Sequence, residues 1–447
     1  MALFELLLYP LYLAFFFFIF RAQRKKMSDP VLKFYHLQGF WIKSLVVLIF
    51  ALFNWKISKG DSFVLYQVEG KHIYDLILKD FSNIKWILMP GKNFDESFLS
   101  DPWNKGYLLN EANFMVVRFV TVISFFTLGK YLLTNLVFSM LAFTGAWKLF
   151  EFFYSQYPHL HKKFAIAILY LPTFVFWSSG VLKDSICIAA VGWITYALYQ
   201  IFYKKNNLIK ALVLLLFFGY LLWIIKPYIL ISYVPFFVLF LILKNVNLVN
   251  SRLIKIILAP ALIIGSMVAF SVVMNKLKDE LGQFAVDSLT KNIKNQNDSY
   301  ENQSEKGGAM FSYGEDFDGS VGGLVKMGPM FVSTTFFRPF IWESKKPTTL
   351  LSSLEGLAMM LFTIMVLYKA GIKTTIQTLT KNPLALYCFL FAIIFALFVG
   401  ATTLNFGTLC RYKIPCMPFY VIALFLIQDA ARQKKENLLK SKQVIGL

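Results

Sequence analysis

Long apolar runs recur along the whole chain and restrict the folds open to it. Residues 256–273 and 384–399 are two examples, and both approach the roughly 20 residues that a helix needs to cross a bilayer. A signal peptide would account for one run near the N-terminus, but not for repetition from end to end. The sequence therefore predicts a single all-α integral membrane domain over residues 1–447.

The charged residues are few and unevenly placed. They make up 16% of the chain and hydrophobic residues 57%, whereas a soluble domain carries roughly 25% charge. A net charge of +20 would favour a nucleic-acid partner for a soluble protein, but here much of the Lys and Arg lies in short connectors between apolar runs. This distribution follows the positive-inside rule. Membrane lipids are therefore expected around the chain, and nucleic acid is not expected as a partner.

A polytopic helix bundle of about 11 spans is predicted from length and hydropathy. The predicted spans are residues 2–20, 38–56, 131–153, 164–181, 185–203, 208–225, 228–243, 254–274, 349–368, 384–403 and 411–428. The positive-inside rule assigns the basic connectors to the cytoplasm. These are residues 21–33, 159–163, 204–210, 244–255 and 369–381, together with the basic tail 429–447.

The apolar segment 113–128 complicates this topology. Counting it as a span would reverse the side of every later basic connector, and it contains Arg118, which is costly in lipid. An interfacial helix with Arg118 turned toward protein or water keeps the connectors on one side, and a snorkelling arginine is the alternative. Two large extracytoplasmic loops result, residues 59–130 and residues 275–348.

Metal binding has weak support in the sequence. The four cysteines lack metal-ligand spacing, so neither a zinc site nor a disulfide framework is predicted. The acidic residues Glu315, Asp316 and Asp318 could recruit a divalent cation through their oxygen atoms. A solvated run of charges is the favoured interpretation, so no cofactor is assigned and a divalent cation stays open.

Ionisable residues gather at the predicted outer ends of the spans. The clusters are Asp61 with Tyr66, Lys183 with Asp184, Lys226 with Tyr228, Arg338 with Trp342 and Glu343, and Arg411 with Tyr412 and Lys413. Basic side chains at the outer face run against the positive-inside rule and need a reason. A phosphate group offers one, because Arg binds its oxygens in two contacts and Lys supplies a point charge.

These clusters predict a site for a lipid-linked phosphate donor. Asp61, where the chain leaves the second predicted span, is the candidate general base. The candidate phosphate ligands are Lys183, Lys226, Arg338, Arg411 and Lys413, and the supporting residues are Tyr66, Arg118, Asp184, Trp342, Glu343 and Tyr412. The aromatic members suit sugar stacking or an interfacial belt. The residues Asp61, Arg118, Lys183, Arg338 and Arg411 are expected to line one outward-open cavity.

Each cluster also has a simpler interpretation. Asp61 could cap a turn. Lys183 and Asp184 could pair with each other across a tight helix hairpin. Arg411 and Lys413 could anchor a span at the membrane interface. Their predicted placement on one face is what favours the functional interpretation.

Several short motifs resemble segments of known membrane proteins. Gly60-Asp61-Ser62 at the start of a long first outer loop, and an interfacial helix around Arg118, resemble the plan of the GT-C superfamily of glycosyltransferases. Residues 411–415, followed by Pro418, resemble the Arg-Tyr-X-X-Pro-X-X-Pro run before a late span in many such enzymes and in O-antigen-polymerase-like proteins. Residues 336–343 and 179–184 resemble segments of uncharacterised multi-span proteins from Bacteroidetes-type bacteria.

The GT-C resemblance implies an activity and a location. Such enzymes transfer a sugar or oligosaccharide from a polyprenyl-(di)phosphate donor to a glycan, protein or lipid acceptor. The expected site is the periplasmic face of a bacterial inner membrane, as in cell-envelope polysaccharide biosynthesis or glycosylation. An O-antigen polymerase or ligase is the nearest alternative, because it needs basic residues but can lack a carboxylate base. A flippase for a lipid-linked substrate and a non-catalytic subunit of a secretion or assembly complex are alternatives from other classes.

Overall fold

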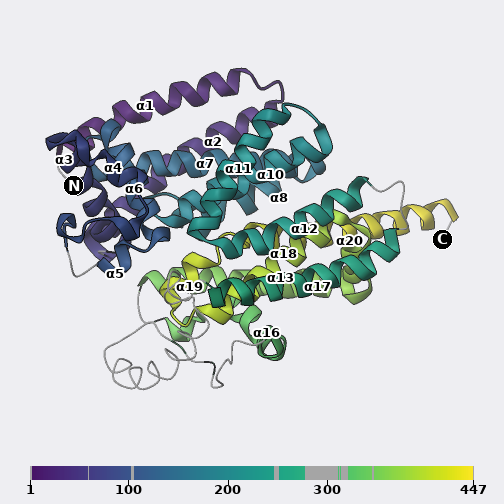
Figure 1. Cartoon of the computed structure of the whole chain (residues 1–447). Helices are drawn as coiled ribbons and strands as arrows, with labels where there is room; N and C mark the ends of the chain where they lie inside the picture. The colour runs from purple at the N-terminus through teal and green to yellow at the C-terminus, as the bar shows by residue number, and fades with distance from the viewer. Residues whose placement is uncertain are drawn as a thin grey trace. The chain divides into compact units, whose positions relative to one another are not determined.

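The computed structural model describes residues 3–58, 60–101, 105–245, 251–276, 311, 313, 321–344 and 347–445. All regular elements within these ranges are helical (Figure 1), which confirms the predicted all-α class. The chain divides into two compact units, Met1–Pro227 and Tyr228–Leu447. Each unit is described by itself.

The N-terminal unit is built around the long helix α7. Its helices are α1 (Leu3–Lys25), α2 (Pro30–Leu52), α3 (Val68–Lys79), α4 (Lys85–Leu88), α5 (Lys105–Leu108), α6 (Glu111–Thr127), α7 (Tyr131–Gln156), α8 (His161–Ala165), α9 (Pro172–Trp177), α10 (Lys183–Tyr199) and α11 (Leu208–Ile225). Helix α7 contacts α1, α2, α6 and α10. Most of its apolar side chains are buried, as expected for the central helix of a bundle.

The C-terminal unit is built around helix α18. Its helices are α12 (Pro227–Asn245), α13 (Ser251–Lys276), α16 (Val321–Phe337), α17 (Pro347–Lys381), α18 (Pro383–Thr402), α19 (Phe406–Tyr412) and α20 (Met417–Ile445). Helix α18 contacts α16, α17 and α20. Leucine side chains of α12 pack against leucines of α13 and α18. Helix α16, which lies within the predicted second loop, is therefore part of the packed bundle.

The apolar helices indicate a multi-pass membrane protein. Among the described residues, eight helices are long and apolar enough to cross a membrane, or up to nine if a bent pair counts as one span. The eight are Phe4–Lys25, Pro30–Ser58, Tyr131–Gln156, Lys183–Lys204, Leu208–Ile225, Pro227–Lys244, Thr349–Lys381 and Pro383–Thr402. The bent pair is α19 and α20, which meet at an angle of 63°.

Two predicted spans are interrupted in the structure, and a third lies in a helix that is not among the eight candidates. Residues 164–181 are interrupted, because a π-helical turn, Ile166–Tyr170, follows α8 and Pro172 then starts α9. Proline lacks an N–H group and keeps the preceding residue extended, which breaks the helix there. Residues 254–274 lie within the helix α13, of which the stretch Pro260–Ala269 is apolar but shorter than a span, and residues 411–428 contain the bend between α19 and α20. The prediction of about 11 spans is therefore not confirmed.

The predicted basic connector 369–381 is helical rather than a loop. Helix α17 continues through it to Lys381, with one break at Gly371, where φ is +72°. Glycine adopts positive φ without the steric cost of a Cβ atom. Lysine and threonine do not stop a helix, and the next proline, Pro383, lies beyond this segment.

Two glycines let helices α7 and α10 pack with their backbones in close contact. A Cβ atom on Gly192 of α10 would lie 1.9 Å from the carbonyl oxygen of Gly145 of α7. A Cβ atom on Gly145 would lie 2.5 Å from Cα of Ala189. Small residues serve this purpose in membrane helix pairs, where close backbone approach supplies packing energy.

Replacing Gly192 with alanine is expected to lower the free energy of unfolding by about 3 kcal/mol, the upper end for overpacking, because the added methyl group meets rigid backbone. Gly219→Ala on α11 is the matched control, since its Cβ atom would meet nothing within 4 Å. Thermal unfolding of both purified variants in detergent checks this. Equal midpoints for the two variants would contradict the packing account.

Candidate functional site

Asp61 lies at an irregular corner that follows the second candidate span. A π-helical turn, Phe53–Ser58, continues from α2, and a second one, Ser62–Gln67, begins directly after Asp61. π-Helical turns are rare and occur frequently at functional sites. The carboxylate oxygen Oδ2 of Asp61 accepts a hydrogen bond from the hydroxyl of Tyr107 at 3.3 Å.

The Asp61 carboxylate belongs to a network that also contains Tyr66. The hydroxyls of Tyr66 and Tyr107 lie 3.0 Å apart, and Tyr66 donates to Oδ1 of Asn113 at 2.9 Å. Asn113 in turn donates to the carbonyl oxygen of Tyr107 at 2.6 Å. Because Tyr66 gives its proton to Asn113, the single hydroxyl proton of Tyr107 can go to Asp61 or to Tyr66, but not fully to both. We call Asp61, Tyr66, Tyr107 and Asn113 the Asp61 network.

Arg118 on α6 is turned toward protein. Its Nη1 atom donates to Oε1 of Glu111 at 2.5 Å, Nη2 donates to the carbonyl oxygen of Met89, and the guanidinium lies over the ring of Phe114. Glu111 also accepts from the backbone N–H of Gly91 at 2.7 Å. These bonds attach the segment around residues 89–91 to α6, so Arg118 has a structural task within the first loop.

Asp184 forms a buried ion pair with Lys226. Lys226 Nζ donates to Oδ1 of Asp184 at 2.6 Å, and the side chains are 3% and 0% exposed. Asp184 lies in the first turn of α10, while Lys226 follows the last turn of α11. Each charge therefore also complements the dipole of its own helix. A phosphate would have to displace Asp184 to reach Lys226, whereas the neighbouring Lys183 is only partly buried.

Lys43 is a buried lysine that was not among the predicted site residues. It lies within α2 and its Nζ atom donates to the carbonyl oxygens of Val175 and Ser178 at 3.1 and 2.8 Å, and to the Ser178 hydroxyl at 2.6 Å. These acceptors lie at the C-terminal end of α9, where carbonyl groups lack helical partners. Lys43 thus fixes the turn that leads into Lys183 and Asp184. Its only sequence signal is a charge inside an apolar run.

The C-terminal unit brings Arg338 together with Glu343 and Lys413. Arg338 Nε donates to both carboxylate oxygens of Glu343 at 3.0 and 3.1 Å, and Nη2 donates to Oε1. The guanidinium carbon lies 4.4 Å from the ring centroid of Phe311 and 5.3 Å from that of Phe406. The buried Lys413 donates to the carbonyl oxygen of Arg338 at 3.4 Å. Glu343 and the two rings therefore hold the guanidinium in a fixed orientation.

Three other predicted residues flank this group. Arg411 and Tyr412 end α19, are partly buried, and immediately precede the bend between α19 and α20. Trp342 is exposed and stacks on Phe340, with ring centroids 4.9 Å apart. An exposed tryptophan suits either a sugar face or the membrane interface.

The predicted site residues are thus divided between the two units. In the N-terminal unit, Asp61 lies with Tyr66 in one group. Asp184 and Lys226 form a second group there, and Lys183 is next to Asp184 in sequence. In the C-terminal unit, Arg338 lies with Glu343 and Lys413. Their expected convergence on a single cavity stays a prediction.

Three carboxylates of the first loop, Asp95, Glu96 and Glu69, were not among the predicted site residues. The adjacent Asp95 and Glu96 are exposed: Asp95 accepts from the backbone N–H and the hydroxyl of Ser97, which hold its pKa below the usual range, and Glu96 pairs with Lys105 at 3.0 Å. Glu69 of α3 is buried and accepts from the backbone N–H of Ser100 at 3.2 Å. Burial raises the pKa of Glu69, and the hydrogen bonds from Ser100 oppose that rise.

The acidic cluster Glu315, Asp316 and Asp318 lies outside the described residues. Within the part of the chain that the structure describes, no group of three or more His, Cys, Asp or Glu side chains is placed to hold a metal ion. In comparisons with known proteins, no family model, curated protein or solved structure matches the chain.

Proposed function

We propose that the protein is a membrane glycosyltransferase that uses a polyprenyl-(di)phosphate-linked sugar or oligosaccharide as donor. The proposed reaction takes place at the outer face of a bacterial inner membrane, and the acceptor is a hydroxyl group of a glycan, protein or lipid. The observation that carries this proposal is the Asp61 network, in which a carboxylate accepts a hydrogen bond from Tyr107 close to the point where the chain leaves a candidate span.

Asp61 acts as general base in this proposal. It takes the proton of the acceptor hydroxyl while the acceptor oxygen forms a bond to the anomeric carbon of the donor sugar. The bond between that carbon and the phosphate oxygen breaks, and the phosphate leaves with the electron pair. Tyr107 orients Asp61 by donating a hydrogen bond to it. When Asp61 becomes protonated, the hydroxyl of Tyr107 can donate its hydrogen bond to Tyr66 instead.

Basic residues stabilise the charge on the leaving phosphate. Arg338, Arg411, Lys413 and Lys183 are assigned to this task. Glu343 occupies Nε and Nη2 of Arg338, so the phosphate is expected at the Nη1 side of that guanidinium. Lys226 is instead assigned a positioning role, because its charge is already neutralised by Asp184.

Replacing Arg338 with alanine is expected to weaken donor binding and to slow transfer, each by about tenfold. An arginine that binds phosphate in both the ground state and the transition state affects both quantities. Donor binding and transfer of radiolabelled sugar from extracted polyprenyl-linked donor, measured on one purified preparation, check this. Arg432→Ala is the control, because Arg432 is an exposed arginine that pairs with Glu436 in the C-terminal helix. A loss shared equally by both variants would contradict the assignment.

The outer placement of residues 59–130 can be tested by thiol labelling. Ser82 is exposed in the first loop and Ser441 is exposed near the end of α20, while the four native cysteines are buried. In intact spheroplasts, an impermeant maleimide is expected to label Ser82→Cys and to leave Ser441→Cys unlabelled until lysis. The opposite labelling pattern would place the Asp61 network on the cytoplasmic side.

A further inference from the structure

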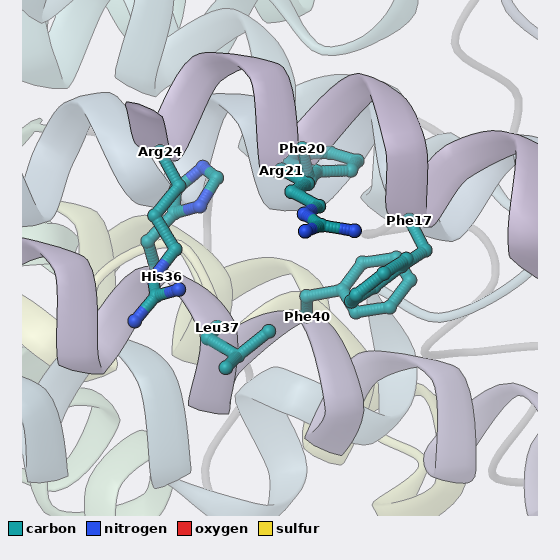
Figure 2. A pocket seen from close by; sticks show the side chains of 7 residues that line it. All are labelled: Phe17, Phe20, Arg21, Arg24, His36, Leu37 and Phe40. Atoms are coloured by element: carbon teal, nitrogen blue, oxygen red, sulfur yellow. The ribbon is translucent and has the colours of Figure 1, made fainter. Parts of the chain in front are cut away.

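A small pocket lies between α1 and α2, close to the connector that joins them. Its volume is about 60 Å³, and Figure 2 shows the side chains that line it: Phe17, Phe20, Arg21, Arg24, His36, Leu37 and Phe40. Arg21 and Arg24 come from the last turns of α1, and His36 comes from the second turn of α2. A cavity needs roughly 10–15 Å³ to admit one water molecule, so this pocket has room for a small polar group.

The polar lining of the pocket is basic. Arg21 is exposed and makes no ion pair with any described residue. Nε of Arg24 donates to the carbonyl oxygen of Lys33 at 3.0 Å, which holds its guanidinium beside the pocket. The one acidic residue between 21 and 36 is Asp29. It is already engaged, because it accepts from Tyr154 at 2.6 Å and from the N–H of Val31 at 2.7 Å.

His36 adds a buried polar atom without a partner. Its side chain is 1% exposed, and within the described residues its Nε2 atom has no hydrogen-bond partner. The imidazole packs against Trp147, with ring centroids 4.7 Å apart, and against Phe20. A buried polar atom that lacks a hydrogen bond costs free energy. A ligand oxygen in the pocket would supply an acceptor for a protonated Nε2.

The remaining walls and the location specify the ligand further. Phe17, Phe20 and Phe40 make one side of the pocket apolar, and Figure 2 shows Arg21 reaching between the two helices toward Phe17 and Phe40. The pocket lies where one candidate span ends and the next begins, beside the exposed Lys25 at the end of α1 and Lys26 directly after it. Basic pockets between membrane helices at such a level bind the headgroups of anionic lipids.

We propose that this pocket binds a phosphate group through Arg21, Arg24 and His36, and that the phosphate belongs to an anionic phospholipid of the surrounding leaflet. The two guanidinium groups supply charge-assisted hydrogen bonds. The aromatic wall faces the first methylene groups of the lipid. This site is separate from the Asp61 network and does not depend on the proposed transfer reaction.

Lipid retention in native mass spectrometry tests the proposal. The full-length protein in detergent is titrated with phosphatidylglycerol, with phosphatidylcholine and with inorganic phosphate. Wild-type protein is expected to retain phosphatidylglycerol, and Arg21→Gln/Arg24→Gln is expected to bind it about tenfold more weakly or worse. Because Arg21 has no ion pair to lose, Arg21→Gln alone keeps the test valid if the double variant fails to fold.

Lys25→Ala/Lys26→Ala is the matched control, since it removes two charges from exposed residues that follow Arg24 and do not line the pocket. Unchanged affinity of this control for phosphatidylglycerol supports a specific site formed by the residues that line the pocket. Equal losses in both double variants would overturn the proposal in favour of general surface charge. Arginine-dependent binding of inorganic phosphate without retention of phosphatidylglycerol would overturn the lipid as the source, and equal retention of phosphatidylcholine would overturn the preference for an anionic headgroup.

Discussion

Asp61→Asn is expected to lower the rate of sugar transfer by about 100-fold or more while donor binding stays within about twofold of wild type. Asparagine has nearly the size of aspartate and can still accept the hydrogen bond from Tyr107. It cannot take the proton of an acceptor hydroxyl, so the loss falls on the chemical step. Donor affinity and single-turnover transfer, measured on the same purified variant, separate the two effects.

Asp75→Asn is the matched control for this experiment. Asp75 is a partly exposed carboxylate of the same unit that pairs with Lys71 one helical turn away, and its loss is expected to leave transfer unchanged. Full activity in Asp61→Asn would exclude a required base at that position. It would then favour a polymerase or ligase that relies on basic residues alone.

Lys226→Met is expected to lower the free energy of unfolding by about 3–5 kcal/mol, because it leaves the buried carboxylate of Asp184 without its ion-pair partner. Asp184→Leu/Lys226→Met removes both charges and is expected to recover most of this stability. Thermal or denaturant unfolding in detergent checks both expectations.

The exposed pair of Lys105 and Glu96 in the same unit provides the comparison. Its side chains are more than half exposed, so Lys105→Met is expected to change stability by less than about 1 kcal/mol. A double variant at Asp184 and Lys226 that is as unstable as Lys226→Met would show that the pair does not act as a unit. If the double variant is stable instead, its rate of sugar transfer relative to wild type measures how much the ion pair contributes to the position of Lys183.

Hydropathy predicted most of the membrane helices because a long apolar run is a local property of the sequence. Residues 208–225 and 384–403 match α11 and α18 closely. Breaks inside apolar runs were missed, since hydropathy does not register backbone direction. Pro172 divides one predicted span, and the bend between α19 and α20 divides another.

The candidate site was predictable only where its residues stand out locally. Asp61 and Arg338 are charged residues at the ends of apolar runs, and that pattern is visible in the sequence. Tyr107 was missed because it lies 46 residues from Asp61, and Lys43 because it lies 135 residues from Ser178. The pairing of Asp184 with Lys226 likewise depends on how α10 and α11 pack. One sequence carries no direct signal for such tertiary partners.

The fate of the donor in proteoliposomes tests the proposed transfer reaction most directly. Purified protein is reconstituted with a polyprenyl-phosphate-linked sugar labelled in both the lipid and the sugar, and acceptors of each class are supplied. Transfer predicts that wild-type protein releases polyprenyl phosphate in an amount equal to the sugar that appears on an acceptor, and that Asp61→Asn releases almost none. A donor that crosses the bilayer with its sugar still attached, or that stays intact with every acceptor, would contradict the proposed reaction.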